Sequence, residues 1–463
     1  MGETRHLERL AASDLLMLWP DDLGWPEDIG AIAILDGSRL LDNDGHVRIE
    51  AVRRQLEPRL QLVPRFRQLL YRPRRGLGWP LWVDAPSFDL ADHVRVHPLA
   101  APGDQARLLQ ACEELRLRRL DPARPLWEVW LLPGLAEGGV GLFLRAHHAL
   151  ADGISGMAAF GALLDLAADT PAAVAPPRTP APIPSAGQLF RDNLRRHMQG
   201  LGRALSGLVH PVRTLRRARR VWPAWREFFT EQRAPQTSLN RPIGGDRRLA
   251  IIRSRLELAK QIAHARHAKV NDVVLAAVAG GLRELLRHRG EDVKGLALRA
   301  AVPVSLHHEQ PGQARGNQNG AMIVPLPLGE PDPVRRLDLI AAKTAERKQH
   351  PHPPGASGVM SFPVVQRAVF RLLYRQRLVN LYVTNVPGPP VPLYLAGARL
   401  LELFPVVPIE GNLTLTVGVF SYAGQLNLTA VADRGTCPDI EVFAQGVRSA
   451  LDDLARSVLV PAS

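Results

Sequence analysis

The sequence predicts a mixed α/β protein built of two domains of similar size. Its 463 residues exceed what a single hydrophobic core usually supports, so two domains of roughly 150–220 residues are expected. Strand-like segments alternate with helical segments in both halves of the chain. A proline-rich stretch after residue 170 separates the halves. We therefore expect an N-terminal domain over 1–170, a connector over 171–240 and a C-terminal domain over 241–463.

The N-terminal segment contains four candidate strands, a basic helical stretch between the first two of them, and two further candidate helices. Hydrophobic patterning indicates strands over 31–35, 94–99, 126–132 and 140–148. Residues 106–120 have helical spacing, with apolar side chains recurring along one side: Leu108, Leu109, Cys112, Leu115 and Leu120. Residues 154–168, rich in Ala, Leu and Met, are expected to form a helix.

The connector combines a stiff stretch with a basic amphipathic one. Six prolines between 171 and 184 predict an extended linker that builds no core. From Leu189 to Phe229, ten arginines are interleaved with Leu, Val and Trp. This region is a solvated helix face, a nucleic-acid patch or an interfacial helix; arginine opposite Leu and Trp favours docking on a membrane surface. The chain carries no helix-turn-helix, zinc or RNA-recognition signature, so no nucleic-acid partner is expected.

The C-terminal segment, from about Arg248, repeats the mixture of elements. Residues 271–289 predict a helix with one apolar face, and Gly290 suits its C-terminal stop. Residues 296–304 and 381–386 indicate buried strands. Residues 413–419 and 425–431 alternate around Ala423-Gly424, which predicts a hairpin.

Composition and charge exclude several classes of protein. Apolar residues make up 46% of the chain and charged residues 22%, as in a globular protein. Cys112 and Cys437 lie far apart without metal-ligand spacing, so neither a disulfide framework nor a metal site is expected. No stretch approaches the roughly 18 apolar residues of a spanning helix, and no secretory leader is evident. The net charge of +13 favours a polyanionic partner such as nucleic acid, an anionic membrane or a phosphate-bearing substrate.

The strongest candidate site follows the strand over 140–148. It reads His147-His148-Ala149-Leu150-Ala151-Asp152-Gly153. Alternation along a strand puts the two histidines on opposite faces, so one can face a cavity while the other packs behind it. A neutral imidazole is suited to take a proton from an alcohol. Asp152 and Gly153 turn the chain into the next helix, which Asp152 can cap. The structural alternative is a histidine pair that merely ends a core strand.

Two histidines, three spacers and Asp-Gly form the signature of the CoA-dependent acyltransferase superfamily. Other segments, in order, resemble one branch of it, the bacterial wax ester synthase/diacylglycerol acyltransferase family. They are Pro125-Leu126-Trp127-Glu128, Asn271-Asp272-Val273-Val274-Leu275-Ala276, Gly316-Asn317, Thr384-Asn385-Val386-Pro387-Gly388-Pro389 and Ser421-Tyr422-Ala423-Gly424. The chain departs from the pattern at Trp19-Pro20-Asp21-Asp22 and Glu27-Asp28, where the family usually has Phe-Leu, a Glu and Met-His.

The resemblance implies two chloramphenicol-acetyltransferase-like domains with the active site in a channel at their interface. It also implies a strand excursion from the second domain that completes the first domain's sheet, for which the hairpin over 413–431 is the candidate. By the same resemblance, His148 is the general base, Asp152 orients the motif through an arginine, and Gly153 leaves room near the pantetheine arm. Neither cysteine has a nucleophile context, so no acyl-enzyme is expected.

Further site residues are weighed against structural roles. Asn271 either only begins a helix or also reaches the active centre as an amide donor to the oxyanion, whereas Asp272 is expected to be structural. Pro125, Leu126, Trp127 and Asn317 are candidate substrate-binding residues, although Trp127 is more typical of core packing. His307-His308 lacks Asp-Gly at the required spacing and is expected to lie in a solvated loop.

The resulting functional prediction is an O-acyltransferase with acyl-CoA as co-substrate and no cofactor. The acceptor is diacylglycerol or a long-chain alcohol, and the location is cytoplasmic, peripheral to the membrane inner face or lipid droplets. Two alternatives stay open: a related enzyme that acylates a specialised metabolite or uses a carrier-bound acyl group, and a non-catalytic lipid-binding relative. The departures around residues 19–28 bear on acceptor preference more than on chemistry.

Overall fold

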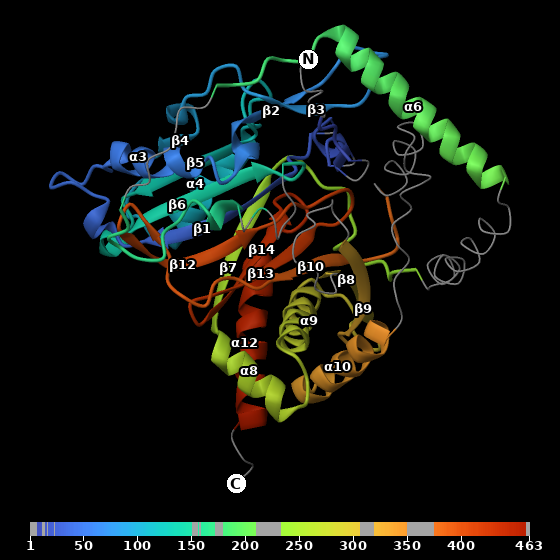
Figure 1. The fold of residues 1–463 in the computed structure, drawn as a ribbon. Helices are drawn as coiled ribbons and strands as arrows, with labels where there is room; N and C mark the ends of the chain where they lie inside the picture. Colours follow the sequence, from blue (N-terminus) through green and yellow to red (C-terminus); the bar gives the residue numbers. More distant parts are fainter. Residues whose placement is uncertain are drawn as a thin grey trace.

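The fold was analysed in a computed structural model. It describes residues 7–11, 14–15, 17–22, 24–150, 156, 159–171, 179–209, 233–305, 319–349 and 375–459. Two six-stranded sheets dominate this part of the chain, and a two-stranded ribbon accompanies them. Figure 1 shows the N-terminal sheet on one side and the C-terminal sheet with its helices on the other.

The N-terminal sheet has the strand order β11-β12-β1-β6-β5-β4. Its strands are β1 (Asp28–Leu35), β4 (Val94–Val96), β5 (Trp127–Pro133), β6 (Val140–His147), β11 (Tyr394–Leu395) and β12 (Ala398–Val406). β1 and β6 pair antiparallel, with Asp28 opposite His147. Every residue of β6 is buried, because this central strand is covered on both faces.

Strand β12 is the excursion that completes the N-terminal sheet. It pairs antiparallel with β1, although the two are far apart in the sequence. The prediction that the hairpin over 413–431 makes this excursion is wrong. That hairpin exists, as β13 (Leu415–Tyr422) and β14 (Gln425–Asp433), but it lies in the C-terminal sheet. Both segments alternate and contain apolar residues, so the sequence pattern does not tell the two sheets apart.

The C-terminal sheet has the order β7-β14-β13-β10-β8-β9. The strands not yet given are β7 (Arg247–Arg255), β8 (Ala297–Ser305), β9 (Asn319–Pro327) and β10 (Leu381–Val386). One face packs against α8 (Leu256–Ala265), α9 (Val270–His288), α10 (Pro333–Gln349) and α12 (Ile440–Leu459). α9 and α12 approach closely, since a Cβ at Gly281 would lie 2.5 Å from Val447.

Shorter elements surround the N-terminal sheet. They are α2 (Trp19–Asp22), α3 (Ile49–Arg59), α4 (Gln105–Leu117), β2 (Gln68–Tyr71), β3 (Leu81–Asp84), and the 3₁₀ turns η1 (Gly37–Arg39), η2 (Pro64–Arg67), η3 (Leu90–Asp92) and η4 (Ala136–Gly138). Helix α6 (Ala186–Val209) extends along the outside of the molecule (Figure 1). Among the described helices, none is both long and apolar enough to cross a bilayer.

An apolar layer joins the two sheets. Side chains of α4, β1, β5, β6 and β12 meet those of β7 and β14 in one buried cluster; examples are Ile32, Phe143, Phe404, Leu249 and Val431. The Glu113 carboxylate in α4 also accepts the backbone N–H of Leu249 in β7 at 2.7 Å. The end of β6, which carries the histidine motif, therefore lies beside the second half of the molecule.

The helix expected over 154–168 ends early. Of the described residues there, 156 and 159–161 are helical, and 162–168 form turns, bends and an isolated bridge from Asp165 to Tyr394. The buried Asp165 carboxylate accepts hydrogen bonds from Gln55 and Arg59 of α3. These contacts hold the segment against the sheet in a non-helical conformation.

Candidate active site

The motif turn is joined to the first strand of the sheet. β6 ends at His147, and the N–H of Leu150 donates to the His147 carbonyl at 2.9 Å. The N–H of His148 donates to the Glu27 carbonyl, just before β1, at 2.7 Å. His147 is buried and His148 is half-buried. The backbone of the turn is thus fixed at both histidines.

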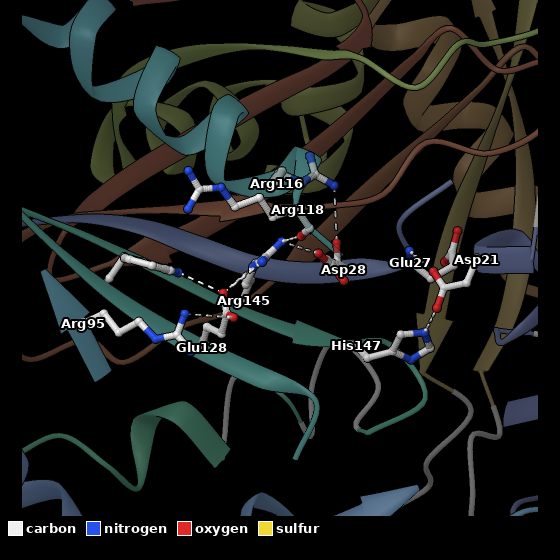
Figure 2. Close-up of polar contacts among 10 residues, drawn as sticks. Asp21, Glu27, Asp28, Arg95, Arg116, Arg118, Glu128, Arg145 and His147 are labelled. Carbon is white, nitrogen blue, oxygen red and sulfur yellow. Dashed lines mark hydrogen bonds and ion pairs between the residues drawn. The ribbon is translucent and has the colours of Figure 1, made fainter. Parts of the chain in front are cut away.

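Both ring nitrogens of His147 are engaged. Its Nδ1 accepts the N–H of Ala149 at 3.0 Å, and its Nε2 lies 2.8 Å from Oδ2 of Asp21 in α2 (Figure 2). A nitrogen that accepts an N–H carries no proton, so the proton of neutral His147 is on Nε2 and is donated to Asp21. The other Asp21 oxygen accepts the N–H of Glu27 at 3.2 Å. Asp21 therefore links α2, the start of β1 and the end of β6.

A buried charge network lies behind the motif. Arg145, two residues before His147, donates to Glu128 at 2.8 Å and 3.2 Å, to Asp28 at 3.1 Å and to the Arg118 carbonyl at 2.7 Å (Figure 2). Arg116 also donates, at 3.4 Å, to the Asp28 carbonyl. Burial raises the pKa of Asp28, although Arg145 and then Arg116 lower it. The network fixes β1, β5 and β6 to each other immediately before the motif.

Glu27 is the most unusual ionisable group near the motif. It is fully buried, and its pKa is raised well above the ordinary value, first by burial and then by the Glu410 carboxyl. Burial likewise raises the pKa of Glu410, in the segment after β12. Burial also raises the pKa of Tyr382 in β10, with Glu410 and Glu27 adding to the effect. Groups from both halves of the molecule thus meet beside His148.

Two family models match the chain. The wax ester synthase/diacylglycerol acyltransferase catalytic domain matches residues 10–274, and the C-terminal domain of the same family matches residues 315–455. The chain belongs to this family. The resemblance predicted from the motif order is confirmed.

Individual relatives agree with this assignment. A probable diacylglycerol O-acyltransferase of Mycobacterium tuberculosis is 31% identical over 440 residues, covering 91% of this chain and 90% of the relative. The solved wax ester synthase/diacylglycerol acyltransferase from Marinobacter aquaeolei is 25% identical, with a TM-score of 0.69 over 98% of this chain and 100% of that one. The first condensation domain of the CDA synthetase shares the fold, at 15% identity and a TM-score of 0.59 over 98% of each chain. The predicted mixed α/β fold with two sheet-rich domains is confirmed.

The family's Pro-Leu-Trp segment packs in the core. Pro125 and Leu126 are buried. Trp127 is fully buried, stacks on Phe66 and His93 at ring-centroid distances of 5.0 Å and 4.5 Å, and donates from Nε1 to the Phe66 carbonyl at 2.7 Å. These contacts bear out the expected packing role of Trp127. Substrate contact by this segment stays a prediction.

The family's Asn-Asp segment begins α9. Asp272 is buried and has the expected structural role, since its carboxylate accepts the Lys269 N–H at 2.9 Å and the Thr344 hydroxyl at 2.7 Å. The side-chain oxygen Oδ1 of Asn271 accepts a hydrogen bond from the side-chain amide Nδ2 of Asn385 at 3.3 Å, so two of the recognised motifs meet here. A role for Asn271 at the reacting atoms stays a prediction. Asp152, Gly153, Asn317 and the His307-His308 pair lie outside the described residues.

Sequence reasoning did not assign the residues that hold the motif in place. Asp21, Asp28, Glu128 and Arg145 were not predicted as site residues. One signal could have identified the network: Arg145 stands in an otherwise apolar strand, and a buried charge requires a partner. Both Asp21 and Asp28 adjoin the motif: Asp21 binds Nε2 of His147, and Asp28 lies opposite His147 in the pairing of β1 with β6.

Proposed function

We propose that this chain transfers a long-chain acyl group from acyl-CoA to the hydroxyl of a lipid alcohol, with His148 as general base. That it is an O-acyltransferase follows from its family. His148 takes the proton of the acceptor hydroxyl, and the oxygen attacks the thioester carbonyl. The new C–O bond forms as the C–S bond breaks, and the coenzyme A thiolate leaves with the proton. General-base assistance of this kind is worth roughly 10²–10⁴ in rate.

The state of His147 is the observation that carries this assignment. Its two ring nitrogens are taken by Ala149 and Asp21, so it has no lone pair with which to accept a substrate proton. His148 is the half-buried member of the pair. We infer that His147 orients the turn and that His148 meets the substrates, in a channel between the domains.

Direct transfer without an acyl-enzyme agrees with the state of both cysteines. Cys112 and Cys437 are fully buried, and burial raises the pKa of each thiol, that of Cys437 to about 11. A buried thiol of raised pKa is a poor nucleophile, because the thiolate is the reactive form. Neither residue lies in the motif.

The acceptor is proposed to be diacylglycerol or a long-chain alcohol, and the product a triacylglycerol or a wax ester. Diacylglycerol acyltransferase is the activity named for the M. tuberculosis relative, and both activities are named for the M. aquaeolei structure. Such acceptors reside in a lipid phase, so the protein must reach a lipid surface. We place it in the cytoplasm, on the inner face of the membrane or on lipid droplets.

Helix α6 supplies a surface suited to this contact. Four of its large apolar side chains recur along one side and are more than half exposed: Phe190, Leu194, Met198 and Leu201. Arg191 and Arg195 are exposed on the same helix, and Leu189 packs against Leu81 and Val83 to anchor it. Apolar and cationic groups together are typical of helices that bind anionic interfaces. Leu215, Val221, Trp222 and Trp225, also expected at this surface, lie outside the described residues.

The experiment is thiol release from long-chain acyl-CoA by the purified protein, with and without hexadecanol or dioleoylglycerol, followed by chromatography of the lipids. Acceptor-dependent release with the matching ester supports the proposal. Activity confined to a polar metabolite or to a carrier-bound acyl group would refute the lipid acceptor.

A further inference from the structure

We propose that Glu27 and Glu410 share one proton across the domain interface and that this carboxyl pair positions His148. The inference rests on the proposed role of His148, and it concerns residues outside the recognised motifs.

The immediate surroundings of Glu27 require a proton. The residue has no exposed surface, and no N–H or hydroxyl group of the described residues donates to either of its carboxyl oxygens. Glu27 and the half-buried Glu410 both lie shortly beyond the paired ends of β1 and β12, where Gly30 is opposite Val406. The Glu410 carboxyl acts on Glu27 by charge and by hydrogen bonding. Two carboxyl groups form a hydrogen bond only when one carries the proton, and two carboxylates in contact at a buried site repel each other.

The wider surroundings supply Glu27 with no cation in contact among the described residues. Asp21 and Asp28 add negative charge near it. The buried Arg116 of α4 and Arg247 of β7 are the cations whose fields reach Glu27, but neither forms an ion pair with it among the described residues. Burial raises the pKa of Glu27 and of Glu410, so one proton shared between the two carboxyl groups satisfies the site.

The pair acts on His148 through the backbone. The Glu27 carbonyl accepts the His148 N–H at 2.7 Å, and the Glu27 N–H donates to Asp21 at 3.2 Å. Glu410 follows Ile409, a member of the apolar layer between the sheets, and its carbonyl accepts the Leu413 N–H at 3.0 Å. With the shared proton in place, the carboxyl pair holds the start of β1 against the segment after β12 that carries Glu410. Without the proton, the two carboxylates repel each other and move β1 away from that segment, at the backbone carbonyl that holds His148.

The test compares pH profiles of kcat for wild type, Glu27→Gln and Glu27→Leu. A glutamine amide donates to Glu410 at every pH, so Glu27→Gln is expected to lose the alkaline decline that wild type shows when the shared proton leaves. Glu27→Leu removes the donor and is expected to lower kcat at least tenfold while KM for acyl-CoA stays within about threefold, because small misplacements of a catalytic group are costly. The exposed Glu57→Gln is the control and keeps the wild-type profile.

A second measurement does not depend on activity. The infrared difference spectrum of wild type minus Glu27→Gln should contain the carbonyl band of a protonated carboxylic acid at neutral pH. Coinciding pH profiles for all variants, or no such band, would overturn the proposal. If His148→Ala stayed active while the band was present, the role of His148 would fail and the shared proton would stand.

Discussion

The charge network behind the motif can be tested by replacing Arg145 with methionine. The change keeps most of the apolar stem and removes the guanidinium. The Arg145 side chain is 2% exposed and donates to Glu128, to Asp28 and to the Arg118 carbonyl. The variant removes this donor from the buried Asp28 carboxylate and from the Arg118 carbonyl, whereas Glu128 keeps the indole N–H of Trp130 at 2.9 Å.

The magnitude follows from burial. Removing one partner of a buried ion pair costs about 3–5 kcal/mol, because the other charge is stranded in a poorly solvated site. For a cooperative unit of 150–250 residues, each kcal/mol lowers the melting temperature by about 2–4 °C, so a fall of roughly 6–20 °C is expected. Arg145 lowers the pKa of Asp28 in the wild type. Without Arg145 the pKa of Asp28 rises further. The loss of folding stability is therefore full at pH values above that pKa, and it diminishes as the pH falls through the pKa and Asp28 becomes protonated.

The assay is calorimetry at pH 5 and pH 8 on Arg145→Met and on Arg253→Met. Arg253 forms a two-pronged ion pair with Glu402, at 2.6 Å and 2.7 Å, but its side chain is 43% exposed. A surface pair contributes about 0–1 kcal/mol, so this control should melt near wild type. If Arg145→Met melted together with Arg253→Met, or lost more stability at pH 5 than at pH 8, the reasoning from buried charge would be refuted.

Three further outcomes are expected. His148→Ala should lower the rate of ester formation by about 10²–10⁴ without lowering the melting temperature, whereas His147→Ala should cost less activity and some stability; a rate for His148→Ala within about threefold of wild type would exclude it as the base. Asp21→Asn should remove the acceptor that keeps the His147 proton on Nε2, which imidazole ¹⁵N chemical shifts would detect, and should lower kcat roughly tenfold to a hundredfold. Unchanged shifts would contradict the placement of the proton on Nε2. Leu194→Glu with Met198→Glu should weaken sedimentation with phosphatidylglycerol vesicles, and binding equal to wild type would exclude α6 as the docking surface.

Local patterning predicted most of the elements near the site. The expected helix over 271–289 is α9, ending at His288 before Gly290, and the hairpin around Ala423-Gly424 pairs Tyr422 with Gln425 as alternation requires. In both, the residues that determine the structure are neighbours in sequence. The motif order also identified the family whose models match residues 10–274 and 315–455.

The contacts that place the histidines depend on distant residues and could not be predicted in the same way. Nothing near His147 in the sequence indicates that Asp21 binds its Nε2, and nothing near β1 indicates that β12 pairs with it. A carboxylate 126 positions away becomes a partner only when α2, β1 and β6 have been brought together. The pattern predicted that the two histidines face opposite sides of the strand, while the tertiary fold determines the proton on the His147 ring.

The strand exchange at β12 has a consequence for how the protein is made. β1 has β6 on one side, but its other edge is unpaired until residues 398–406 have left the ribosome. Through most of synthesis the N-terminal sheet therefore exposes an apolar strand edge, and such edges recruit other chains. A fragment ending in the connector should aggregate unless the 394–406 segment is supplied separately. Completion of the histidine site is thus tied to synthesis of the second half of the chain.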